Sequence, residues 1–268
     1  MAFVKGCSFK DLFFGIKKRI RFKLINNCCG LIRLYFIILI VISGTCNAQT
    51  FNGQEIIEKS IHFHDPENIW MKSHIILDLK ETRHGGTDRN TLVEINNTSG
   101  YFNLTRQLGD VSLRYEIKDG NCNLYLNGES NFSEIDREKY SLNEEGGRFL
   151  RDYYLYLWGM PMKLLDWGTV IENEVVEIDF NSVESYQVRV TYNKEVGSDT
   201  WYFYFNRTDF QLHAYQFYHD EDINDGEYIL LKNLMKVGSM NIPKERSWFV
   251  NKDHKYLGND ILENNILK

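Results

Sequence analysis

Two histidines and two carboxylates near one another could bind a metal ion. His62, His64 and Asp65 are close in sequence, and Glu58 precedes His62 by one helical turn. Two histidines with one carboxylate suit zinc or iron. On a helix, however, side chains two positions apart project about 200° from each other, so one helix cannot direct both histidines to one ion. We therefore favour structural roles at a helix end and keep a metal-dependent enzyme as the weaker alternative.

Other catalytic patterns are missing from the sequence. It contains neither a G-x-S-x-G nucleophile turn nor an H-E-x-x-H zinc pair. Gly85-Gly86 and Gly146-Gly147 lack the lysine and helix start that a phosphate-binding loop needs. Cys122 lies in an alternating apolar segment, which predicts a buried structural thiol. The sequence therefore predicts no enzyme, no catalytic residue and no cofactor.

Aromatic side chains are concentrated in two segments, 153–162 and 199–205. In the second segment the aromatic residues alternate onto both faces of a predicted strand. One interpretation is a strand covered on both sides; the other is that one face lines an apolar cavity, with methionines as an adaptable wall. Under the second interpretation the candidate ligand-binding residues are Tyr154, Trp158, Met160, Met162, Trp201 and Phe203.

The first 48 residues predict a cleavable signal peptide. Eight basic residues and one acid occupy positions 1–33, the apolar run Leu34–Ile42 follows, and small residues lead to a cleavage site after Ala48. The apolar run is shorter than the roughly 20 residues of a spanning helix. Retention as a signal anchor and lipidation at Cys46 are the alternatives. The remaining residues, 49–268, are expected to form one domain.

The charge balance changes once this leader is removed. The whole chain has 31 basic and 37 acidic residues, and without residues 1–48 it would keep 23 and 36, a net charge near −13. Such an acidic domain argues against nucleic acid as a partner and against electrostatic attachment to anionic lipid. Cys122 would remain as the single cysteine, so no intrachain disulfide could form.

Hydrophobic periodicity predicts a helix followed by strands. Apolar residues and Ser60 recur with helical spacing over 53–64, and Pro66 ends this helix. Alternation over 71–79, 113–117 and 122–126 then indicates strands. Asp119-Gly120 separates the last two runs and is a strong hairpin signal, because such turns need positive φ at both central residues.

The middle of the chain is predicted to be helical. Residues 135–158 lack the two-residue period, and Phe149, Tyr153, Tyr156 and Leu157 share one helical face. Met160-Pro161-Met162 ends the helix, and a short turn follows.

The second half again predicts strands joined by tight turns. These strands span Val175–Phe180, Ser185–Tyr192, Thr200–Asn206, Gln211–Tyr218 and Glu227–Met235. Successive strands with short connections pair antiparallel. The fold class is therefore α+β and mostly β: a strongly curved antiparallel sheet, an incomplete barrel, with helices across its concave face.

Several segments also resemble known families. Gly53–Lys59, Tyr156–Leu164, Gly197–Phe203 and Asp225–Ile229 resemble DUF6503, a group of exported Bacteroidetes proteins of unknown function. The helix-first order, Ser185–Tyr192 and Thr200–Phe217 resemble the LolA/LolB-like lipoprotein carriers. The resemblance implies a half-barrel whose helices close its mouth and which binds acyl chains or another apolar ligand. It implies no catalytic residue.

These observations predict an exported, non-enzymatic binding protein of the bacterial cell envelope. Its expected partner is a hydrophobic small molecule or lipid, and its expected place is the periplasm or the outer membrane. The alternative is an envelope protein-interaction module, in which the edge of the aromatic strand pairs with a partner protein. Without its leader the chain should have no membrane-spanning segment.

Overall fold

The computed structural model describes residues 51–268, which form one compact unit. The predicted signal peptide, its cleavage after Ala48 and the alternative lipidation at Cys46 lie outside the described residues. The predicted helix is helix α2 (Gly53–His64). Asn52 and Glu55 form a capping box at its start, in which each side chain binds the backbone N–H of the other.

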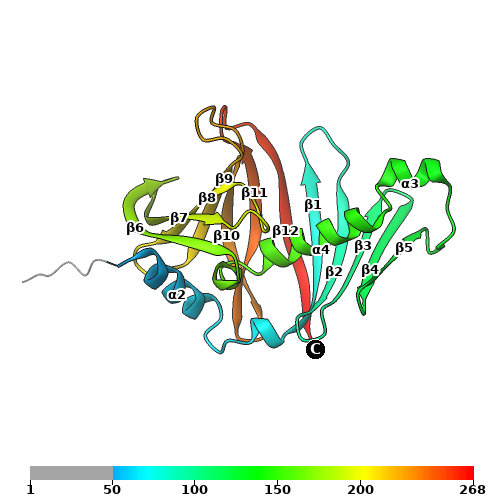
Figure 1. The fold of residues 1–268 in the computed structure, drawn as a ribbon, viewed down its shortest axis with the longest axis horizontal. Helices are drawn as coiled ribbons and strands as arrows, with labels where there is room; N and C mark the ends of the chain where they lie inside the picture. Colours follow the sequence, from blue (N-terminus) through cyan, green and yellow to red (C-terminus); the bar gives the residue numbers. More distant parts are fainter. Residues whose placement is uncertain (1–50) are drawn as a thin grey trace, which may run out of the picture. The chain divides into compact units, whose positions relative to one another are not determined.

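Twelve strands form one antiparallel sheet, drawn in Figure 1. They are β1 (His74–Arg83), β2 (Arg89–Asn96), β3 (Tyr101–Leu108), β4 (Val111–Lys118), β5 (Asn121–Leu126), β6 (Thr169–Phe180), β7 (Val183–Tyr192), β8 (Thr200–Asn206), β9 (Leu212–Tyr218), β10 (Glu227–Val237), β11 (Met240–Val250) and β12 (Tyr256–Leu267). Their order is β5-β4-β3-β2-β1-β12-β11-β10-β9-β8-β7-β6.

The sheet is open, with β5 and β6 as its two edges. Each half is a meander of neighbouring strands, and the antiparallel pair of β1 with β12 joins the halves. The chain between the two edge strands contains α3 (Glu134–Tyr140), α4 (Glu144–Trp158) and η2 (Met162–Leu165). This segment must pass from one edge of the sheet to the other, which places α4 across the concave face, as Figure 1 shows. The predicted curved, incomplete barrel is confirmed.

Local predictions hold at the hairpin and differ elsewhere, and β2, β3, β11 and β12 lie in segments for which no strand was predicted. Asp119 and Gly120 have positive φ between β4 and β5, as the sequence predicts. The expected helix over 135–158 is instead two helices, because Ser141 adopts a left-handed conformation and Asn143 caps a new helix. The strand expected from Met71 begins only at His74, since Trp70–Lys72 form a single helical turn, η1.

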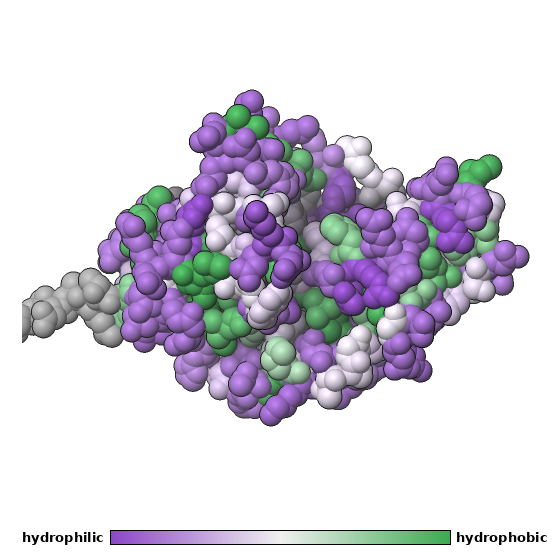
Figure 2. Space-filling model, viewed as in Figure 1, coloured by the Kyte–Doolittle hydropathy of each residue, from purple (hydrophilic) through white to green (hydrophobic). Residues whose placement is uncertain are grey.

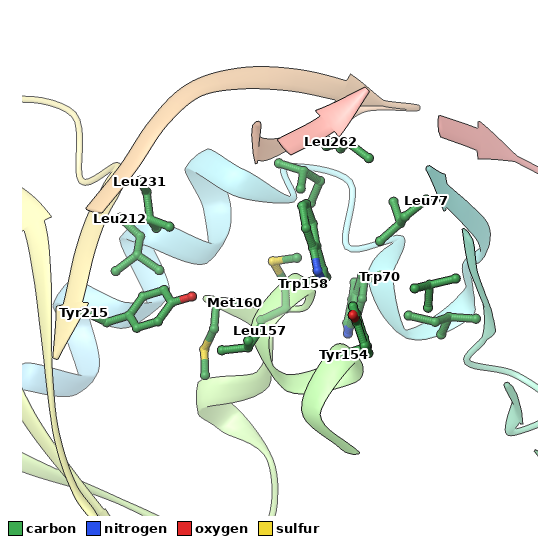
Figure 3. Close-up of a cluster of buried hydrophobic side chains, with 14 of the residues drawn as sticks. Trp70, Leu77, Tyr154, Leu157, Trp158, Met160, Leu212, Tyr215, Leu231 and Leu262 are labelled. Carbon is green, nitrogen blue, oxygen red and sulfur yellow. The ribbon is translucent and has the colours of Figure 1, made fainter. Parts of the chain in front are cut away.

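One large hydrophobic core fills the space between the sheet and the helices. It combines alternate residues of the strands with the inner sides of α2 and α4. Figure 3 shows Trp158 and Met160 among side chains from η1 and from strands of both halves of the sheet. A second, small cluster around Tyr204 covers the other side of β8. The aromatic strand is therefore covered on both faces, and both interpretations of its alternation apply in part.

Candidate functional site

A cavity of about 630 Å³ lies where α4 meets the concave side of the sheet. We call it the aromatic cavity. It is lined by Arg83, His84, Arg89, Phe149, Tyr153, Tyr156, Leu157, Asp199, Trp201, Phe217, His219, Glu227, Trp248, Leu257 and Gly258. Its size falls within the range of about 300 to 1,000 Å³ that is usual for small-molecule sites. On the molecular face in Figure 2, hydrophilic residues dominate and hydrophobic residues appear in separate groups.

Helix α4 supplies one wall of the aromatic cavity. Phe149, Tyr153, Tyr156 and Leu157 recur at helical spacing and all line it. The Phe149 and Tyr153 rings stack with centroids 6.0 Å apart, and Tyr153 stacks on Trp248 of β11 at 6.4 Å. Burial raises the pKa of Tyr153 and of Tyr156 well above the usual value. These phenols therefore stay neutral, and the wall is uncharged.

Strands β8 and β9 supply the opposite wall. Trp201 and Phe217 are cross-strand partners, and their ring centroids are 4.9 Å apart. Tyr156 of α4 meets the Trp201 ring edge to face at 5.3 Å, and the Phe203 ring stacks with the Trp201 ring at 5.9 Å. Such aromatic contacts contribute about 0.5–1.5 kcal/mol each beyond area burial. Trp201 is therefore held in one orientation while part of it stays accessible.

Polar groups divide the rim of the aromatic cavity into an acidic and a basic side. Asp199 and Glu227 lie on the side of β8–β10. There His219 Nδ1 donates a hydrogen bond to Asp199 Oδ1 at 2.9 Å, and this contact raises the pKa of His219. Burial raises the pKa of Glu227. Arg83 and Arg89 lie across the cavity on the side of β1 and β2.

A buried ionic network holds the basic side in place. Glu81 is 1% exposed and accepts hydrogen bonds from Arg89 Nε at 2.8 Å, Thr91 Oγ1 at 2.5 Å and the Tyr154 hydroxyl at 2.7 Å. The pKa of Glu81 is lowered: burial opposes ionisation, but the charges of Arg89 and Arg106 outweigh it. Glu81 is thus an ionised carboxylate that fixes two guanidinium groups from β2 and β3.

The structure places one of the six predicted ligand-binding residues on this cavity. Trp201 lines it, whereas Tyr154, Trp158, Met160, Met162 and Phe203 are at most 7% exposed and lie in the core. Figure 3 shows Tyr154 and Trp158 in the buried cluster that also contains Trp70. Trp158 also lies against the buried Arg246 guanidinium, 3.5 Å from its ring centroid. A ligand could reach these five residues only after α4 or η2 moved.

Sequence reasoning did not select the other aromatic residues of the wall as ligand contacts. Phe149, Tyr153 and Tyr156 share a predicted helix face with Leu157, and this shared face was the available signal. Phe217 and Trp248 carried no comparable signal, because their position depends on which strands become neighbours.

His64 and Asp65 have structural roles. Nδ1 of His64 donates to the Asn241 carbonyl at 2.6 Å, and its Nε2 accepts from the Leu212 N–H at 3.1 Å. Asp65 accepts from the backbone N–H of Ile69 and of Trp70. His62 is exposed. Within residues 51–268 no group of three or more His, Cys, Asp or Glu is arranged to hold a metal ion.

A second cavity, of about 380 Å³, opens on the other side of Tyr156. Tyr156 lines both this cavity and the aromatic cavity, and its hydroxyl hydrogen-bonds the hydroxyl of Tyr192. Trp167, which is 73% exposed, lies on this second cavity. The Tyr156–Tyr192 pair therefore separates the two spaces.

The chain belongs to the protein family described as "Family of unknown function (DUF6503)", whose model matches residues 33–265. At the level of sequence, no curated protein matches it.

The solved structures that are similar to the chain include the following two. One is the LolA superfamily protein NE2245 from Nitrosomonas europaea, with 9% identity, a TM-score of 0.46, and coverage of 82% of this chain and 94% of that one. The other is a putative outer membrane lipoprotein-sorting protein domain from Vibrio parahaemolyticus, with 8% identity, a TM-score of 0.47, and coverage of 81% and 92%.

None of the helices within residues 51–268 has the length and apolar character needed to cross a membrane.

Proposed function

We propose that this protein is a non-enzymatic binding protein of the bacterial cell envelope and that its ligand is hydrophobic, a lipid or an acyl chain. The aromatic cavity is the observation that carries the proposal. Its two walls come from α4 and from β8–β9, and their rings leave about 630 Å³ unfilled. Ligand sites are typically concave and lined mostly by apolar and aromatic side chains with a few polar groups, so a space of this size and lining on the concave face supports a ligand site.

The energetics of burial support an apolar ligand. Removing about 200 Å² of acyl surface from water contributes roughly 5 kcal/mol at about 25 cal/mol per Å². The neutral phenols and the rigid Trp201 ring add contact area without an ordering cost, because their own packing already fixes them. A chain with few polar atoms can therefore bind here without a strong polar anchor.

A fluorescent fatty-acid probe tests this proposal when binding is compared between two Trp→Ala variants. Trp201→Ala removes part of the wall of the aromatic cavity and should weaken binding about tenfold. Trp167→Ala is the matched control, because this exposed tryptophan lies on the second cavity. Native mass spectrometry of protein purified from its own cell envelope should show bound lipid.

Two results would contradict the proposal. Probe binding that is unchanged in Trp201→Ala, or lost equally in Trp167→Ala, would remove the aromatic cavity as the site. Absence of both lipid in the native mass spectrum and probe binding by the unaltered protein would reject ligand binding altogether.

A second candidate function, protein interaction, is supported by edge strand β6. The interaction module expected from the sequence used the edge of Thr200–Asn206, but β8 lies inside the sheet between β7 and β9 and has no free edge. Strand β6 does lie at an edge, and its Val176 and Ile178 are 44% and 39% exposed. An open strand can pair with a strand of another protein.

Val176→Lys should abolish capture of an envelope partner that pairs with the edge of β6. Val196→Lys, which lies outside this strand, should leave that capture unchanged.

A further inference from the structure

A third cavity, of about 360 Å³, has a basic lining. It is lined by Arg89, Arg106, Leu108, Leu113, Tyr115, Lys139, Tyr140, Ser141, Gly146, Phe149 and Leu150. Three of these residues are cationic and none is a carboxylate. We call it the basic cavity. Acidic residues outnumber basic ones in the whole chain, 37 to 31, so this lining is a local inversion of the overall charge.

The two arginines of the basic cavity are only partly neutralised. Both face Glu81, which bonds Arg89 directly and lies 3.7 Å from Arg106 Nη2. Arg89 uses Nε and Nη2 for Glu81, and Arg106 uses Nε for Thr91 and Nη2 for the Tyr154 hydroxyl. Within residues 51–268 the Nη1 group of each has no hydrogen-bond partner. Lys139, the third cationic residue of the lining, is exposed and does not contact Glu81.

The basic cavity adjoins the aromatic cavity. Arg89 and Phe149 line both. Across the aromatic cavity, Glu227 begins β10, which three strands, β11, β12 and β1, separate from β2, and Asp199 directly precedes β8, which lies two strands further away. A negatively charged group would therefore be repelled on the side of β8–β10 and attracted on the side of β2–β3. This polarity would orient a ligand that has one charged end.

We infer that the ligand is an amphiphile with an anionic group, a phosphate or a carboxylate, held in the basic cavity by Arg89, Arg106 and Lys139, with its apolar chain in the aromatic cavity. The inference rests on the proposed function and adds the chemical class and the orientation of the ligand. Planar guanidinium groups suit such oxyanions, since they offer paired N–H donors in a fixed geometry. Glu81 holds both guanidinium groups in place before the ligand arrives, which lowers the ordering cost of binding.

Calorimetric titration with decyl phosphate, decanol and inorganic phosphate tests the inference. The two decyl compounds share one chain, so their difference reports the anionic group alone. At low ionic strength decyl phosphate should bind about tenfold more tightly than decanol. This difference should shrink as salt is added, because salt screens partly exposed charges. Inorganic phosphate alone should bind much more weakly than decyl phosphate.

Lys139→Glu reverses the exposed charge of the basic cavity without touching the buried network. It should weaken the binding of decyl phosphate about three- to fivefold and leave the affinity for decanol unchanged. Lys232→Glu is the matched control, because Lys232 is exposed on β10 and lines neither cavity. Trp201→Ala should weaken both decyl compounds to the same degree.

The outcomes separate the two proposals. The inference that the ligand is an anionic amphiphile is overturned if decyl phosphate and decanol bind with equal affinity. It is also overturned if Lys139→Glu weakens decyl phosphate binding no more than Lys232→Glu does. In both cases the proposal of an apolar ligand still stands. Inorganic phosphate binding as tightly as decyl phosphate identifies a free-anion site and also overturns it. If neither decyl compound binds, the proposed function itself fails.

Discussion

At the scale of single residues, burial decides what His64 can do. Its ring is fully buried, and one nitrogen donates to Asn241 while the other accepts from Leu212. That pair of bonds requires the neutral ring, and burial lowers the pKa of His64 to about 4. The same residue type that suggested metal binding in the sequence therefore connects α2 to β9 and β11.

The buried histidine makes stability depend on pH. In the unfolded chain His64 takes up a proton near pH 6.5, whereas the folded state binds one only near pH 4. Between these values the unfolded state binds more protons, so the free energy of unfolding falls as the pH decreases. In urea denaturation, the contribution of His64 to the free energy of unfolding should fall by about 2 kcal/mol between pH 7 and pH 4.5.

His64→Gln supplies the comparison, because an amide can donate and accept without titrating in this range. Burial also lowers the pKa of His213 to about 4, so the variant should retain part of the pH dependence. A variant whose stability falls with acid as steeply as that of the unaltered protein would contradict the assignment to His64.

At the scale of elements, the contact between α4 and edge strand β5 depends on one glycine. A Cβ atom added to Gly147 would lie 2.6 Å from the Cys122 sulfur, so the helix approaches the strand only because this position has no side chain. Glycine inside a helix costs about 1 kcal/mol relative to alanine. The close contact between α4 and β5 therefore outweighs the low helix propensity of glycine. Cys122, which the sequence predicted to be buried, is only partly buried in this contact.

The effect of Gly147→Ala should therefore change sign with the residue at position 122. In the unaltered background it should destabilise the protein by about 1–3 kcal/mol, since the added methyl group overpacks the contact. In a Cys122→Ala background the clash is removed, and the same substitution should stabilise by up to about 1 kcal/mol. Chemical denaturation of the unaltered protein, the two single variants and the double variant measures the coupling free energy between positions 147 and 122. If the two substitutions changed the free energy of unfolding additively, a steric clash between these positions would be contradicted.

At the scale of the whole molecule, β12 holds the sheet together. It pairs with β1 on one side and β11 on the other, and these are the first and the eleventh strands along the chain. Both meanders therefore share one core, to which β12 contributes the fully buried Leu262.

Leu262→Ala should consequently destabilise both halves together, by about 2–5 kcal/mol. Ile266→Ala is the control, because Ile266 is in the same strand but 56% exposed and should change the free energy of unfolding by at most about 0.5 kcal/mol. Tryptophan fluorescence and far-ultraviolet circular dichroism should report one shifted transition. Two separate transitions in the Leu262→Ala protein would contradict a shared core.

Local pattern alone predicted much of this fold. The spacing over 53–64 located α2, the Asp119-Gly120 pair located a hairpin, and alternation located Thr200–Asn206 at its observed bounds. The shared face of Phe149, Tyr153 and Tyr156 contained most of the helical wall of the aromatic cavity. These features depend on neighbours a few residues apart, and backbone geometry translates such spacing directly into faces.

Other features were decided only by tertiary structure. The neighbours of β12, the burial of Tyr154 and Met160, and the meeting of Glu81 with Arg89 and Arg106 require contacts between strands and a helix distant in sequence. Aromatic density therefore selected residues that fill the core along with one that lines the cavity. Hydrophobic periodicity shows which face of an element is buried, but a cavity forms where two such faces fail to fill the space between them, and that mismatch depends on how the whole sheet curves around α4.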